Sequence, residues 1–154
     1  MRTLYVIDTN SIISFYHDVF KNVPDYQGSL ELSSKAKRII SQAIISRTTR
    51  IRLSIPSVVF VEIYEKWLKT EEFARKFYYE IFSPLKQSPN VEVRPIDREV
   101  MENLIHIGGN LQNHDLHDKI ILASAITLES QLITTDADII NYVHERNLIP
   151  GILK

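Results

Sequence analysis

Short apolar runs alternate along this chain with longer segments in which apolar residues recur every three or four positions. The runs are typical of buried strands and the spaced segments of amphipathic helices. Strands are predicted at residues 3–7, 51–55, 91–94 and 131–134, with a last short strand at 148–149. Helices are predicted at residues 10–18, 32–47, 58–69, 71–82, from Asp97 to just before Gly108, 118–129 and 137–146.

The alternation of strands and helices predicts an α/β fold: an α/β/α sandwich around a central parallel sheet. Turn residues predict a loop at 19–29, and two prolines bound an expected linker at 84–89. With 154 residues and no internal repeat, we expect a single domain over residues 1–154.

The amino-acid composition bears on where the protein is found and on what it binds. The chain has no cysteine, which excludes disulfides and thiolate metal sites. Neither a signal peptide nor a membrane span is evident, so we expect a cytoplasmic protein without membrane contact. The net charge of −1 argues against a protein that coats nucleic acid, but it leaves room for an enzyme that acts on nucleic acid.

Four acidic residues have unusual positions in this pattern. Asp8 follows the first strand directly, and Asp136 follows the strand at 131–134. Asp118 opens an apolar helix, and Glu62 lies in an otherwise apolar segment. The carboxyl ends of parallel strands share one edge of a sheet, where open α/β folds bind ligands. We therefore expect the four carboxylates to gather at this edge.

Each acid also has an ordinary structural explanation. Asp8 and Asp136 suit helix N-caps, and Asp118 suits the positive end of a helix dipole. Glu62 has a natural ion-pair partner four residues later, in Lys66. The four together are harder to explain in this way than each one alone.

Divalent metal explains why carboxylates would be gathered. Neighbouring carboxylates repel one another, and a divalent cation removes that conflict. Mg²⁺ prefers oxygen ligands, and Mn²⁺ suits the same donors. Such ions activate water and stabilise the leaving oxygen in phosphodiester hydrolysis. Thr9, Asn10 and Thr135 are candidates to orient water or phosphate beside the acids.

At this point the sequence resembles a known family, the PIN domains. The resemblance rests on four motifs in the family's order: Val6-Ile7-Asp8-Thr9-Asn10, Val59-Phe60-Val61-Glu62, Leu116 to Ala125 with Asp118 within it, and Leu132-Ile133-Thr134-Thr135-Asp136. They span nearly the whole chain. By size the chain is similar to VapC-type toxins, although residues 17–50 form a longer connection than in the compact members and Asp115 adds an acid.

The resemblance implies a metal-dependent ribonuclease, held inactive by an antitoxin and often homodimeric. It implies that the catalytic and metal-binding residues are Asp8, Glu62, Asp118 and Asp136, with Mg²⁺ or Mn²⁺ as cofactor. Thr9 or Asn10 would support the site, with Asp138 as a weaker candidate for the fourth position.

Two other classes of function compete with this hypothesis. His114, His117 and Asp118 suggest an HD-type phosphohydrolase, but that fold is all-helical and needs further histidines at helical positions. A non-catalytic RNA- or protein-binding module would keep the acids as caps. The leading hypothesis is an endoribonuclease that hydrolyses RNA phosphodiester bonds, as the toxin of a toxin–antitoxin pair.

Basic and aromatic residues add weaker indications. Contacts to the phosphate backbone are conceivable for Lys35, Lys37, Arg38, Arg47, Arg50 and Arg52, although a solvated surface is the simpler explanation. Tyr78, Tyr79 and Phe82 have the spacing for base stacking or, more simply, for core or dimer contacts. Trp67 is predicted to pack in the core.

Overall fold

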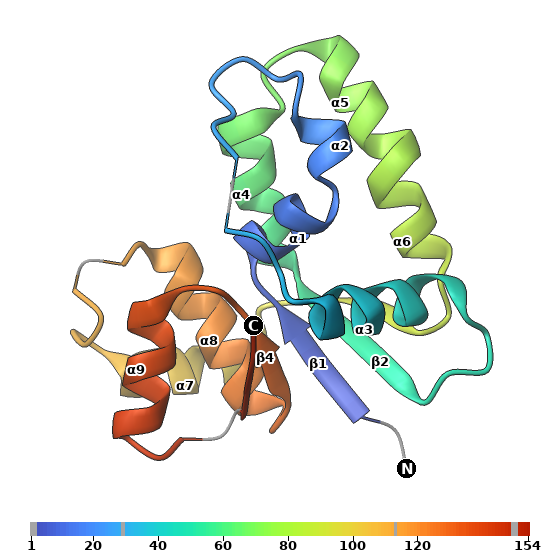
Figure 1. The fold of residues 1–154 in the computed structure, drawn as a ribbon. Coiled ribbons are helices and arrows are strands. Elements are labelled where there is room, and N and C mark those ends of the chain that lie inside the picture. Colours follow the sequence, from blue (N-terminus) through green and yellow to red (C-terminus); the bar gives the residue numbers. More distant parts are fainter. Residues whose placement is uncertain (1–2, 29, 113, 149–150) are drawn as a thin grey trace.

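A five-stranded parallel sheet lies at the centre of the computed structural model, which describes residues 3–28, 30–112, 114–148 and 151–154 (Figure 1). The strands are β1 (Thr3–Ile7), β2 (Ile51–Pro56), β3 (Val91–Arg94), β4 (Gln131–Ile133) and β5 (Gly151–Leu153). Their order is β3-β2-β1-β4-β5, and every neighbouring pair is parallel. The predicted α/β fold with a parallel sheet is therefore confirmed.

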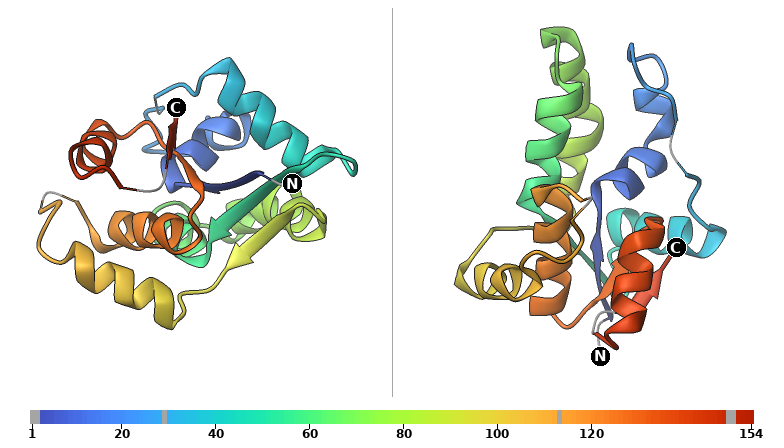
Figure 2. Two further views of the ribbon diagram at one scale, coloured as in Figure 1. Left: turned by 90° about the horizontal axis from the view of Figure 1, so that it is seen from below. Right: turned by 90° about the vertical axis from the view of Figure 1, so that its left-hand side faces the viewer.

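Helices cover both faces of the sheet, as the view along the layers shows (Figure 2). One face carries α1 (Thr9–Phe15), α3 (Ser34–Ile45) and α9 (Ala137–Glu145); the other carries α4 (Ser57–Trp67), α7 (Arg98–Ile107) and α8 (Leu116–Thr127). Burial explains this sandwich, because strands that are apolar on both sides must be covered on both sides. Val6 and Ile7 of β1 and Leu53 and Ile55 of β2 are fully buried.

Helix α8 is the most central helix. Its residues 120–125 are all buried, as the nearly continuous apolar sequence predicts. It packs against α4, α7 and β1. Because Asp118 lies in the first turn of this buried helix, its position relative to the sheet is fixed by packing.

A second group of helices extends past the carboxyl ends of the strands (Figures 1 and 2). It consists of the end of α4, the short α2 (His17–Phe20) and a long helical segment made of α5 (Glu71–Phe77), a π-helical turn (Tyr78–Phe82) and α6 (Ser83–Gln87). The fully buried Phe20 holds these pieces together through edge-to-face contacts with Trp67, Phe73 and Phe77. These helices form a projecting lobe beside the sheet edge where the acids lie.

The structure corrects several predicted boundaries. The helix predicted at 10–18 is split at Tyr16 into α1 and α2, and the second of these reaches into the predicted loop at 19–29. The predicted linker at 84–89 is wrong, because α6 occupies most of it. The last strand lies at 151–153; of the predicted strand at 148–149, Leu148 is outside any strand and Ile149 lies outside the described residues.

Helix α8 begins at Leu116, two residues earlier than predicted. Asp115 is its N-cap, and Asp118 lies within its first turn. Over the described ranges, no helix is both long enough and apolar enough to cross a membrane.

Candidate metal centre

Asp8 and Asp136 lie side by side because their strands are neighbours. Strands β1 and β4 pair in parallel, and the Asp8 N–H donates to the carbonyl of Ile133 at 3.2 Å. Asp8 Oδ1 accepts from the Ser11 N–H at 2.9 Å and caps α1. Asp136 Oδ1 accepts from the N–H groups of Asp138 and Ile139 and caps α9. The predicted caps are thus present, and both are at the predicted sheet edge.

Burial and charge act together on Asp8. Its side chain is buried, and this burial raises the pKa of the Asp8 carboxyl, with a smaller contribution from the charge of Asp136. Hydrogen bonds from the side chains of Ser11 and Thr134 oppose the shift. The carboxylates of Asp8 and Asp136 therefore repel each other at this edge.

Glu62 reaches the same region from α4. Its side chain is 7% exposed, and Lys66 Nζ lies 2.7 Å from Glu62 Oε2, as the alternative explanation predicted. The other oxygen, Oε1, is buried and has no hydrogen-bond partner among the described residues. A buried carboxylate oxygen without a partner is costly, and a metal ion would satisfy it.

Asp118 is the member most strongly affected by its neighbours. Burial first, and then the charges of Asp115, Glu62 and Asp136, raise the pKa of Asp118 to about 6, while His114 acts in the opposite direction. Asp118 is therefore electrostatically coupled to two of the other three predicted acids. Glu62 and Asp136 therefore lie near Asp118, and Asp8 lies beside Asp136 at the end of the neighbouring strand.

Two histidines lie among these acids. His114 Nε2 lies 2.9 Å from Asp136 Oδ2, and the His114 side chain is 8% exposed. His117 Nδ1 lies 3.5 Å from Asp115 Oδ2. The potential ligand atoms of Glu62, Asp115 and His117 lie within 4.8 Å of one another, and so do those of His114, Asp136 and Asp138.

His114 lies in the segment before α8, and His117 lies in the first turn of α8. Their spacing with Asp118 suggested an HD-type site only as an alternative. The parallel sheet rules out that all-helical alternative. The histidines add imidazole donors to an otherwise oxygen-rich cluster, which widens the range of metals it suits.

The predicted supporting residues have different surroundings. Thr9 is buried, and its hydroxyl has no hydrogen-bond partner in the described part of the chain, whereas Asn10 is exposed. Thr135 is half-buried. The sequence interpretation missed Thr134, whose hydroxyl accepts from the Asp136 N–H at 3.1 Å and whose side chain also bonds to Asp8. Thr134 thus positions both strand-end acids.

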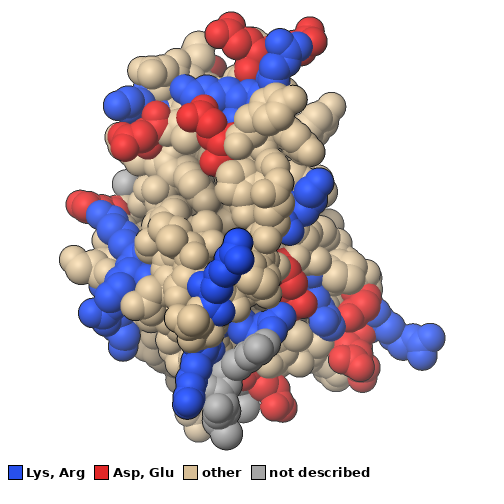
Figure 3. Space-filling view, turned by 90° about the vertical axis from the view of Figure 1, so that its right-hand side faces the viewer, with Lys and Arg blue, Asp and Glu red and all other residues tan. Residues whose placement is uncertain are grey.

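The basic residues of α3 and β2 do not join this cluster. The carbonyl of Arg50 pairs with the N–H of Thr3, at the opposite end of β1 from Asp8. Lys37 is engaged with Glu31 at 2.6 Å. Figure 3 shows the surface on this side, where Lys and Arg are spread among neutral residues instead of forming a compact patch. A phosphate-binding role for these residues stays a prediction.

The residues present fit a divalent cation. Glu62 and Asp115 share one possible ligand group with His117, and Asp136 and Asp138 share another with His114. Lys66 supplies an ammonium 2.7 Å from Glu62 and 3.9 Å from Asp115. The buried oxygen of Glu62 without a partner and the raised pKa of Asp118 are both relieved by one further positive charge.

Comparisons with known proteins support the fold. No family model matches the sequence, and no curated protein sequence is significantly similar. The structure is similar to a chain of the crystal structure of VapBC2 from Rickettsia felis bound to a promoter DNA fragment, with a TM-score of 0.61 and 17% identity over 99% of this chain and 100% of that one.

Two further structures are similar. VapBC-1 from nontypeable Haemophilus influenzae gives a TM-score of 0.60 with 17% identity over 99% and 98% of the two chains. DNA-bound VapBC from Salmonella typhimurium gives a TM-score of 0.56 with 19% identity over 99% and 96%. At these identities the similarity shows the fold alone. The resemblance to VapC-like PIN domains inferred from the four motifs is thus confirmed at the level of the fold.

Proposed function

We propose that this chain is a single PIN-like domain, residues 1–154, that hydrolyses RNA as a metal-dependent endoribonuclease. The observation that supports the proposal is the repulsion among acids at the sheet edge, which a cation would relieve. The charge of Asp136 raises the pKa of Asp8, and the charges of Glu62 and Asp136 raise the pKa of Asp118. Two of these acids follow strands and two lie on packed helices, so the fold holds all four in place.

In this function the four acids would hold Mg²⁺ or Mn²⁺. When bound, the ion supplies a nucleophilic water and stabilises the leaving oxygen. The chain's own residues prepare the site. Thr134 orients Asp8 and Asp136, His114 fixes the second oxygen of Asp136, and Lys66 neutralises part of the charge at Glu62. Asp138 and Thr135 lie next to Asp136 as supporting residues.

The partners follow from the same proposal. The similar structures are toxin–antitoxin complexes, and we propose that this chain acts as the toxin of such a pair and is restrained by an antitoxin protein. We also propose a homodimer, in the cytoplasm. Size-exclusion chromatography with light scattering tests the dimer, because a monomeric mass at micromolar concentration would contradict it.

The decisive experiment compares RNA cleavage by the wild type, Asp118→Asn and a matched control. Labelled RNAs and single-stranded DNAs are incubated with Mg²⁺, with Mn²⁺ and with EDTA. The control is Asp18→Asn, an exposed acid of α2 whose carboxylate lies 3.6 Å from the ammonium of Lys21. We expect metal-dependent cleavage of RNA by the wild type and the control, and none by Asp118→Asn.

A non-catalytic interaction module is the second candidate, favoured by the cap hydrogen bonds that Asp8 and Asp136 make. It predicts no cleavage under any of these conditions and no metal binding by calorimetry. Cleavage that persists in EDTA, or in Asp118→Asn, would contradict the nuclease site proposed here.

A further inference from the structure

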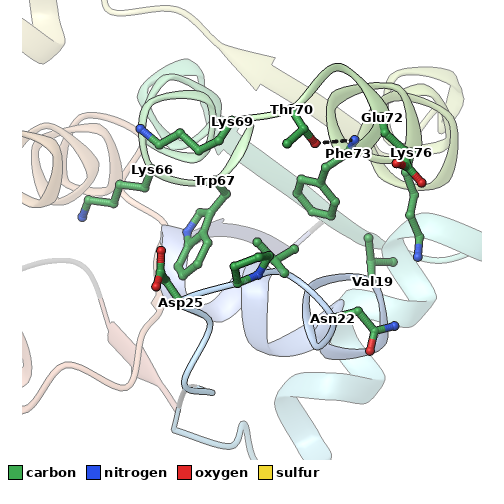
Figure 4. Close-up of a pocket in the computed structure, with 12 residues that line it drawn as sticks. Val19, Asn22, Asp25, Lys66, Trp67, Lys69, Thr70, Glu72, Phe73 and Lys76 are labelled. Carbon is green, nitrogen blue, oxygen red and sulfur yellow. Dashed lines mark hydrogen bonds between the residues drawn. The ribbon is translucent and has the colours of Figure 1, made fainter.

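A cavity of about 380 Å³ lies between the projecting lobe and the segment that follows α2 (Figure 4). Its walls come from residues 19–25 on one side and from the end of α4 and the start of α5 on the other. Ligand sites in proteins have volumes of this order, and this cavity is large enough for one nucleotide unit.

Aromatic rings form part of this wall. Trp67 and Phe73 project from α4 and α5 toward the 19–25 segment, and both are half-buried (Figure 4). Edge-to-face contacts with Phe20 hold each ring in position. A fixed aromatic ring with an accessible face is the usual platform for a base of single-stranded RNA. Trp67 also packs against the core, as predicted, and Tyr26 contacts it edge-on.

Lysines surround the aromatic wall. Lys66, Lys69 and Lys76 line the cavity, against the carboxylates of Asp25 and Glu72. Lysine ammonium groups are common contacts to phosphate oxygens. Because Lys66 is paired with Glu62, Lys69 and Lys76 are the lysines of this lining that we expect to contact the phosphates of an occupant.

Lys66 connects this cavity to the cluster of acids. It lines the cavity, and its ammonium contacts Glu62 at 2.7 Å. Successive phosphates of an RNA strand are only several ångströms apart, so a strand whose scissile phosphate lies at the acids must place an adjoining nucleotide near Lys66. The geometry points to this cavity as a nucleotide subsite, in which Trp67 or Phe73 stacks on a base of the substrate strand and Lys69 and Lys76 bind its phosphates.

This inference rests on the proposed function for its substrate, but it is tested without cleavage. The chain contains one tryptophan, so tryptophan fluorescence reports on this cavity alone. The probes are the four 5′-mononucleotides, which have no internucleotide bond to cut, with the matching nucleosides and inorganic phosphate as separate titrations. We expect saturable quenching by nucleotides, weaker quenching by nucleosides and none by phosphate.

Substitutions of the lysines that line the cavity test whether nucleotides bind there. Lys69→Gln and Lys76→Gln should each weaken nucleotide binding about two- to fivefold, the loss expected when one solvent-exposed ion pair is removed, and the double variant should weaken it further. The matched control is Lys86→Gln, an exposed lysine of α6 outside the cavity, which should bind nucleotides as the wild type does. Melting temperatures of all variants check that they are folded.

The outcomes separate the two proposals. Nucleotide binding by a protein that cuts no RNA would leave the subsite standing and contradict the nuclease. RNA cleavage without quenching would show that the cavity does not bind the substrate strand. Quenching that the double variant leaves unchanged would show the same, and so would binding of a protein segment, but of no nucleotide, in the cavity. Failure of both assays would overturn both proposals.

Discussion

Replacing Asp118 with Asn should stabilise the metal-free protein at neutral pH while it abolishes activity. Asp118 lies in the first turn of the most buried helix, next to Glu62, Asp136 and Asp115. Asn has nearly the same shape and keeps one acceptor, but it removes the charge. The opposite effects on stability and activity distinguish a metal site from an ordinary helix-terminal acid.

The magnitude follows from the pKa of Asp118, which burial first and neighbouring acids second raise from 3.8 to about 6. The folded state binds this proton more tightly than the unfolded state, so stability falls as pH rises from about 4 to about 6 and stays reduced above that range. Two pKa units correspond to about 3 kcal/mol, and solvent screening of a half-buried group reduces this to about 1–2 kcal/mol. For a protein of this size, that is about 3–6 °C in melting temperature.

The assay is thermal and urea unfolding in EDTA at pH 4 and pH 7.5. We expect Asp118→Asn to be more stable than the wild type at pH 7.5 and nearly equal at pH 4, and Mn²⁺ to stabilise the wild type more than the variant. The matched control is Asp97→Asn on α7. The Val100 N–H and the Arg94 guanidinium hold the pKa of Asp97 below its usual value, so this variant should lose stability at pH 7.5. A lower stability of Asp118→Asn at pH 7.5 would refute the reasoning.

Three further predictions follow from particular contacts. Asp8→Asn should abolish cleavage in the RNA assay without lowering the melting temperature at neutral pH, because Asn caps helices as well as Asp does and removes a buried charge. Lys66→Met should bind Mn²⁺ about two- to fivefold more tightly by calorimetry, because the ammonium no longer competes for Glu62; an unchanged affinity would contradict this. Ile121→Ala, at a side chain 1% exposed in α8, should lower the free energy of unfolding in urea by about 2–5 kcal/mol.

Much of the fold and the positions of two site residues were predictable from the sequence. Parallel strands end at one edge, so two strands each followed by an acid had to place Asp8 and Asp136 near each other. Glu62 was detectable because a charge within an apolar helix requires a partner. These inferences depend on periodicity and burial, which the sequence shows directly.

The loop before α8 could not be predicted in this way. The sequence of residues 110–115 has no periodic pattern, and the start of α8 depends on individual hydrogen bonds such as the one from the Asp118 N–H to Asp115 Oδ1. As a result, the start of α8, the capping role of Asp115 and the contact of His114 with Asp136 were all missed.

Pro84 was misinterpreted for a different reason. A proline within an apolar helical pattern usually ends the helix, and a linker was therefore expected. Here Pro84 is in the first turn of α6, directly after the π-helical turn, where its missing N–H removes no necessary hydrogen bond. The helical segment therefore continues past the proline, and it keeps α5 packed beside Phe20 and the cavity.

The structural and the chemical explanations of these acids are compatible because each carboxylate has two oxygens. Asp136 uses Oδ1 for the cap of α9 and presents Oδ2 to His114, and Glu62 uses Oε2 for Lys66 and leaves Oε1 buried without a partner among the described residues. Asp8 likewise caps α1 through Oδ1. In each case one oxygen fixes the side chain and the cap or ion pair leaves the second oxygen unused. A cap or an ion pair at such a residue is therefore no evidence against metal binding, since a carboxylate held at one oxygen loses less conformational entropy when the other binds an ion.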